Sequence, residues 1–162
     1  MRDIRVIGDP VLRSPAAPVT DFDRDLRRLI DEMMEAMYAA DGVGLAAPQI
    51  GVAKRVFVYD VSGRKGHVVN PELVVDDTEQ ILDQEGCLSI PGRTTGKPLY
   101  ATTPRAAGVS LSGVDRLGRP VKLKARGMPA RCFQHECDHL DGVLYVDHLA
   151  KDTARQILLQ AP

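Results

Sequence analysis

Apolar side chains recur every three or four positions in two parts of the chain. In residues 22–37 they alternate with Asp, Arg and Glu, which predicts an amphipathic helix. Asp21 is its expected N-cap and Gly42 its expected stop. The same spacing returns in residues 129–140 and predicts a second helix, while a shorter one is expected at about residues 149–159.

Val-rich runs bounded by turn residues predict strands between the two main helices. The expected strands are residues 55–61, 66–69, 73–75, 108–111 and 120–125. Turns are expected at Gly63, at the Asn70-Pro71 pair and at residues 115–118. The first twenty residues contain three prolines and are expected to form an extended arm. Strands clustered between helices favour an α+β fold, with short mixed or antiparallel sheets packed around the helix at residues 129–140.

Length and composition restrict the class of protein. A chain of 162 residues is expected to form one domain, residues 1–162. Its 21 basic and 22 acidic residues give a net charge of -1, which argues against nucleic acid as the substrate. Three cysteines are too few for a disulfide framework and indicate a reducing compartment. No apolar run approaches the roughly 18 residues of a membrane helix, so no membrane partner is expected.

His135, Glu136 and His139 form an HExxH motif in the second predicted helix. Helical residues four apart are rotated by about 40° and displaced by about 6 Å, so both imidazoles can face one ion. Glu136 lies beside that face, where a carboxylate can take a proton from a water whose pKa a metal has lowered. The alternative, a chance match, explains none of this chemistry. Cys137 points to the opposite side and is expected to be a packed, unreactive thiol.

A catalytic metal site usually has a third protein ligand and one open position. Tyr145 stands where a metzincin would have its third His, and no Glu follows Glu136. The remaining downstream options are Asp141, Asp147, His148 and Asp152. Upstream, Cys87 follows Gly86, and a thiolate with two imidazoles suits iron(II) or zinc. A lone Cys is more often a buried small apolar side chain, but the HExxH motif favours Cys87 as a ligand.

Three segments resemble the peptide deformylase family in order and spacing. They are GVGLAAPQ at residues 42–49, EGCLS at residues 85–89 and QHECDHL at residues 134–140. Three shorter matches extend the resemblance over essentially the whole chain: DPVLR at residues 9–13, Asn70-Pro71 and Ala130-Arg131. Residues 91–105 depart from it, because they are longer than the compact segment of many members. The role of Arg93 and the side-chain preference after methionine are therefore open.

The resemblance implies a metal-dependent hydrolase that removes the formyl group from the N-terminal formylmethionine of newly made polypeptides and releases formate. It implies one divalent ion per chain, iron(II) in the family, although zinc, nickel or cobalt also suit such ligands. The implied ligands are Cys87, His135 and His139, with Glu136 as general acid and base.

The resemblance also implies two oxyanion donors, the Gln49 side chain and the Leu88 backbone N–H. Such donors stabilise the negative charge that develops on the formyl oxygen. Gln49 has an alternative role as a loop residue that bonds its neighbours. By resemblance Val43, Gly44 and Leu45 run alongside the peptide, and Cys132 lines the methionine pocket unless it serves only in packing. Asp138 could orient a ligand, although an exposed helix Asp is commoner.

Two other classes of protein share part of this pattern. A zinc endopeptidase would need a downstream third ligand, and a non-catalytic metal protein would have no use for Glu136 and Gln49. In some relatives the C-terminus reaches the ribosome, so Lys151 and Arg155 are candidates for weak ribosome contact or for plain solvation. Met1 lies close to the matched residues 9–13, which favours the bacterial cytoplasm over an organelle.

Overall fold

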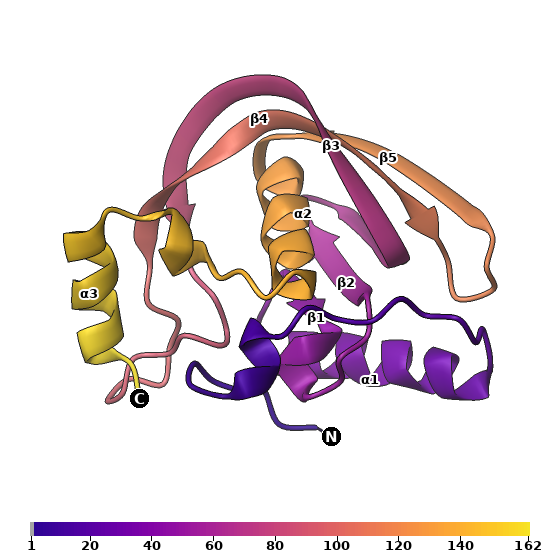
Figure 1. Cartoon of the computed structure of the whole chain (residues 1–162), viewed down its shortest axis with the longest axis horizontal. Helices are drawn as coiled ribbons and strands as arrows, with labels where there is room; N and C mark the ends of the chain where they lie inside the picture. The colour runs from indigo at the N-terminus through magenta and orange to yellow at the C-terminus, as the bar shows by residue number, and fades with distance from the viewer. Residues whose placement is uncertain (1) are drawn as a thin grey trace.

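The computed structural model describes residues 2–162 and confirms the α+β class (Figure 1). Three α-helices lie within these residues: α1 (Arg24–Ala39), α2 (Gly127–Leu140) and α3 (Lys151–Gln160). The strands are β1 (Gly44–Ala46), β2 (Val56–Val61), β3 (Arg64–Glu85), β4 (Ala101–Val114) and β5 (Pro120–Arg126). Short 3-10 helices are η1 (Pro10–Arg13), η2 (Ala47–Ile50) and η3 (Tyr145–His148). No helix within residues 2–162 combines the length and apolar character needed to cross a membrane.

The strands form one antiparallel sheet in the order β1-β2-β3-β4-β5. Figure 1 shows β3, β4 and β5 curving over α2, while α1 lies on the far side of β1 and β2. The predicted turn at Gly63 joins β2 to β3, where Ser62 and Gly63 both have positive φ, as tight hairpins require. Helix α2 therefore occupies the concave side of the sheet, and the sheet positions everything around it.

The predicted turn at Asn70-Pro71 was wrong. The strands expected at residues 66–69 and 73–75 are parts of the single long strand β3, which changes register between Val69 and Glu72. Asn70 has φ 52, and its side-chain amide exchanges hydrogen bonds with Val19 N–H (2.8 Å) and Val19 C=O (3.0 Å). Asn70-Pro71 therefore marks a bulge that is anchored to the N-terminal arm, rather than a chain reversal.

Other boundaries also differ from the prediction. The cap of α1 is Asp23 rather than Asp21, because its carboxylate accepts from Leu26 N–H at 3.0 Å. The helix ends at Ala39, before Gly42. The expected extended arm contains the 3-10 turn η1, capped by Asp9. Strand β4 has 14 residues, more than three times the length predicted at residues 108–111, since its first half lies where apolar alternation is weak.

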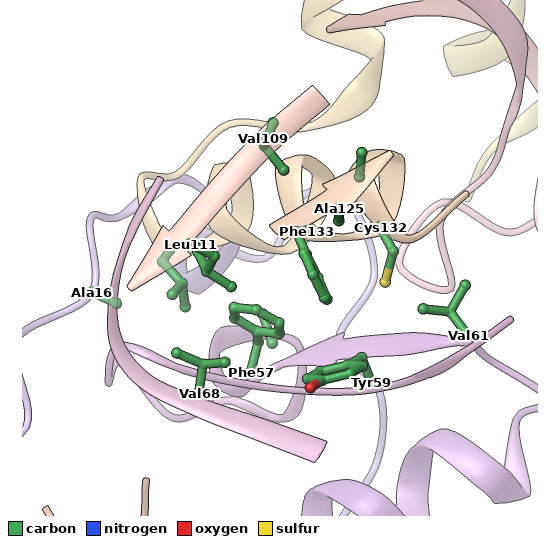
Figure 2. Packing of buried hydrophobic residues seen from close by; sticks show 13 residues of the cluster. Ala16, Phe57, Tyr59, Val61, Val68, Val109, Leu111, Ala125, Cys132 and Phe133 are labelled. Carbon is green, nitrogen blue, oxygen red and sulfur yellow. The ribbon is translucent and has the colours of Figure 1, made fainter. Parts of the chain in front are cut away.

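An aromatic and aliphatic cluster fills the space between the sheet and α2 (Figure 2). Phe133 of α2 points toward Phe57 and Tyr59 of β2, and its ring meets Tyr59 edge to face at 5.0 Å between centroids. Removing such a buried ring costs about 3–5 kcal/mol. The HExxH helix is thus buried along most of its length and is held rigidly against the sheet.

Candidate metal centre

The HExxH helix and the turn after β3 bring three ligand atoms together. The Nε2 atoms of His135 and His139 lie 3.2 Å apart, and Cys87 Sγ lies 3.3 Å from His139 Nε2. All three ligand atoms fall within 4.8 Å of one another. The structure therefore groups the Cys and both His residues that the sequence predicted.

The downstream alternatives to Cys87 have other partners. Asp141 pairs with Arg55, and Asp147 pairs with Arg13. His148 contacts Asp138, while Asp152 is exposed at the start of α3. Among the described residues, only the Cys/His/His group offers three converging ligands of this kind.

The geometry of the group fits a divalent ion. Metal–nitrogen bonds of about 2.0–2.1 Å and metal–sulfur bonds of about 2.3 Å in a tetrahedral site place ligand atoms about 3.3–3.6 Å apart. The observed separations of 3.2 and 3.3 Å are close to this range. Glu136 Oε1 is buried with no hydrogen-bond partner within residues 2–162, as suits a carboxylate whose partner is a water beside the ion.

Glu85 orients His135, a role that the sequence analysis missed. Its carboxylate lies 2.7 Å from His135 Nδ1, so the opposite nitrogen, Nε2, faces the ion site. Arg105 donates two hydrogen bonds to the same carboxylate (2.6 and 3.0 Å), and Arg131 donates one (3.0 Å). Burial alone would raise the pKa of Glu85, but hydrogen bonds from His135 and Arg105 outweigh it and hold that pKa well below its ordinary value.

Asp138 interacts with the ligands only indirectly. It accepts a 2.6 Å hydrogen bond from Arg105 and lies 2.8 Å from His148 Nε2. The proposed orienting role therefore runs through Arg105 and Glu85 to His135, and Asp138 does not touch a ligand itself.

Glu136 is buried beside the ligands, and Gly44 lies against its carboxylate. Burial raises the pKa of Glu136 to about 7, a value suited to a group that takes up and releases a proton. A Cβ on Gly44 would lie 2.5 Å from Glu136 Oε2 and 2.9 Å from Cys132 Sγ. An added Cβ at position 44 would therefore displace the Glu136 carboxylate or the Cys132 side chain.

Gln49 has both a loop role and a site role. Its Oε1 accepts from the Ala46 N–H at 2.9 Å, which is the neighbour-bonding alternative. Its Nε2 donates to Ser89 Oγ at 3.1 Å and lies 3.6 Å from Cys87 Sγ. Within residues 2–162 the Leu88 N–H has no hydrogen-bond acceptor, and both residues line the cavity described next.

A cavity of about 480 Å³ opens at these residues. Val43, Gly44 and Cys132 line it, as the sequence analysis expected. Leu45 does not: its side chain is fully buried in a second apolar cluster beneath α1. Lys97, Pro98, Tyr100 and Met128 also line the cavity.

The two remaining cysteines differ in position. Cys132 both lines the cavity and packs in the cluster of Figure 2, and burial raises its pKa well above the ordinary value. Cys137 packs against the same cluster, and burial raises its pKa to about 12. A thiol with that pKa is a poor nucleophile, in agreement with the packed, unreactive thiol predicted for Cys137.

Comparisons with known proteins agree with this geometry. The family model "Polypeptide deformylase" matches residues 1–155. The peptide deformylase of Acidothermus cellulolyticus is 54% identical over 149 residues, covering 92% of this chain and 79% of that protein. The crystal structure of a Legionella pneumophila peptide deformylase superposes with a TM-score of 0.91 at 40% identity, covering 99% of this chain and 92% of that one.

A further solved structure carries a bound ligand. The peptide deformylase of Synechococcus elongatus in complex with actinonin gives a TM-score of 0.90 at 41% identity, covering 99% of this chain and 85% of that one. Three findings indicate the same family. They are the three sequence motifs, the α+β fold with its Cys/His/His group, and the family match over residues 1–155. The chain belongs to the polypeptide deformylase family.

Proposed function

We propose that this peptide deformylase hydrolyses the formyl amide of N-formylmethionyl nascent peptides at the site formed by Cys87, His135, His139 and Glu136. The observation that carries the proposal is the convergence of three ligand atoms within 4.8 Å at a cavity that the buried Glu136 also lines. The products are formate and a peptide with a free N-terminal methionine.

The ligand set supports one divalent ion per chain. When bound, such an ion supplies a water of lowered pKa and a Lewis acid for the formyl carbonyl. One thiolate and two imidazoles suit iron(II), zinc, nickel and cobalt alike, and we infer iron(II) from the family to which the chain belongs. Metal analysis of anaerobically purified protein decides between them.

Glu136 carries the proton in the proposed reaction. It takes a proton from the attacking water, and passes it to the nitrogen as the carbon–nitrogen bond breaks. Negative charge develops on the formyl oxygen as the water adds. Gln49 Nε2 and the Leu88 N–H lie on the cavity wall as donors for that charge.

The peptide is proposed to lie along β1. This strand pairs only with β2, so within residues 2–162 its other edge is free to accept an added strand. Gly44 of that edge and Val43 just before it line the cavity, and Leu45 contributes backbone only. Cys132 and Met128 offer apolar contact for the methionine side chain.

The whole chain is proposed to act as one catalytic domain in the bacterial cytoplasm. The family match over residues 1–155 supports a single domain, and the three cysteines are free thiols.

Ribosome contact stays a prediction: Lys151 and Arg155 are exposed on α3. Replacing both with Ala should weaken co-sedimentation with ribosomes if that contact exists, and should leave it unchanged if they are only solvated.

The proposal is tested by formate release from formyl-Met-Ala by anaerobically purified protein, with metal measured on the same sample. Formate at about one metal per chain supports it. Acetyl-Met-Ala and unblocked peptides run alongside test selectivity, because a tight site should exclude the acetyl methyl. Cleavage of internal peptide bonds, or no formate from fully metallated protein, would contradict the proposed reaction.

A further inference from the structure

The segment between the Cys87 turn and β4 lines the cavity but has no assigned part in the proposed reaction. Its residues Lys97, Pro98 and Tyr100 line the cavity. The backbone is closed on itself by a bridge between Pro91 and Pro98 and by a 2.8 Å hydrogen bond from the Gly92 N–H to the Lys97 carbonyl. The backbone of Lys97 is therefore fixed beside the cavity.

The segment carries two cationic side chains, and Arg93 is committed elsewhere. Its Nη2 donates to the carbonyls of Leu159 (2.7 Å) and Ala161 (3.1 Å), and its backbone N–H donates to the carbonyl of Gln160 (2.8 Å). The guanidinium thus satisfies the free carbonyls at the end of α3. Arg93 anchors the segment to the C-terminal helix and leaves Lys97 as the cation at the cavity.

Lys97 has a free charge. It is exposed, and no carboxylate lies within 4.0 Å of it among residues 2–162. The other basic side chain of the lining, Arg131, is paired with Glu85 at 3.0 Å. The lining also contains an exposed acidic residue, Asp41, which precedes β1 and does not pair with Lys97.

Gly44 of β1 lines the same cavity as Lys97, Pro98 and Tyr100, so a peptide added along β1 would enter the space that Lys97 borders. We propose that Lys97 is a specificity-determining residue that favours substrates carrying an acidic side chain among the first residues after formylmethionine. This proposal rests on the deformylase reaction and the strand addition proposed above. Because the backbone at Lys97 is already fixed, less conformational entropy is lost when its side chain contacts a substrate.

The expected effect is modest because the lysine is exposed. One exposed ion pair is worth a few-fold in affinity, and a like charge costs a similar factor. Exchanging Asp for Lys in the substrate should therefore change kcat/KM by about fivefold. Added salt should reduce that ratio, because the Debye length is about 10 Å at 0.1 M.

The test compares formyl-Met-Ala-Ala-Ala with peptides that carry Asp or Lys at the second, third or fourth position. In the wild type, the Asp peptide should exceed the Lys peptide in kcat/KM at one or more positions. Lys97→Glu should invert that ratio, and Lys97→Arg should preserve it. Lys65→Glu, in the β2–β3 hairpin and away from the cavity, should keep the wild-type ratio.

Each Asp/Lys ratio of kcat/KM is measured within one variant. A loss of folding or of metal lowers the rate with both peptides and leaves that ratio unchanged. An Asp/Lys ratio near one at all three positions in the wild type, with formyl-Met-Ala-Ala-Ala hydrolysed, overturns the Lys97 proposal and leaves the deformylase reaction intact. A ratio equally shifted by Lys97→Glu and Lys65→Glu also overturns it, since net charge alone would then explain the effect. No formate from the reference peptide would instead overturn the proposed reaction.

Discussion

Replacing Glu85 with Ala should destabilise the protein more than any ordinary surface substitution. The carboxylate is 5% exposed and receives hydrogen bonds from two buried guanidinium groups, Arg105 and Arg131. Arg105 keeps Asp138 as a partner, but Arg131 is left with the carbonyls of Thr103 and Ile81. Breaking a buried pair by removing one partner costs about 3–5 kcal/mol.

The assay is denaturant unfolding of both proteins with chelator present, so that metal release does not contribute. Glu79→Ala is the matched control, because it removes a carboxylate from the same strand that is exposed and unpaired within residues 2–162. It should change the free energy of unfolding by no more than about 0.5 kcal/mol. A loss below about 1 kcal/mol for Glu85→Ala would refute the reasoning.

The pH dependence supplies a second signature. Since the folded pKa of Glu85 is lowered from its ordinary value of 4.5, its contribution is fully present above about pH 4.5 and is lost as pH falls toward the folded pKa. The difference in free energy of unfolding between wild type and Glu85→Ala should therefore shrink below pH 4.5. A difference that grows on acidification would contradict the assigned direction.

Three further outcomes are expected at the site. Cys87→Ala should lose the metal measured by elemental analysis yet keep its circular dichroism, whereas a Cys137→Ala control should retain the metal. Glu136→Gln should retain metal and lose about 10²–10⁴-fold in kcat, and unchanged kcat would exclude proton transfer by this residue. Gly44→Ala should displace the Glu136 carboxylate and lower kcat by about 10²-fold, so activity near wild type would mean that the 2.5 Å contact relaxes freely.

Local chemistry made much of the metal centre predictable. His135 and His139 are four residues apart on one helix, so their convergence follows from helix geometry. Cys87 is 52 residues from His139, and its place in the group was inferred from the chemistry of a thiolate beside an HExxH motif and from the family resemblance, rather than from spacing. Glu85 was missed because its partners Arg105 and Arg131 lie 20 and 46 residues away. No local pattern marks a carboxylate that is buried by such distant partners.

The strands were less predictable than the helices for a related reason. The second half of β3 is largely exposed, so residues 76–84 lack the apolar alternation by which a half-buried strand is recognised. Asn70-Pro71 resembles a turn, yet the tertiary contact with Val19 keeps the chain in the strand as a bulge. Likewise, Arg93 is bound to the end of α3, 66 to 68 residues further along the chain.

Cys87 and His139 are 52 positions apart, and the chain between them contains β4, β5 and most of α2. An unfolded chain can offer an ion the nearby pair of imidazoles, but the thiolate joins them only after the antiparallel sheet has closed. The ion should therefore bind the native state far more tightly than the unfolded ensemble, and ion at 100 times its Kd would stabilise the fold by about 2.7 kcal/mol. Metal capture would then report the completion of long-range strand pairing, which makes the spectrum of a cobalt-substituted site a direct probe of late folding.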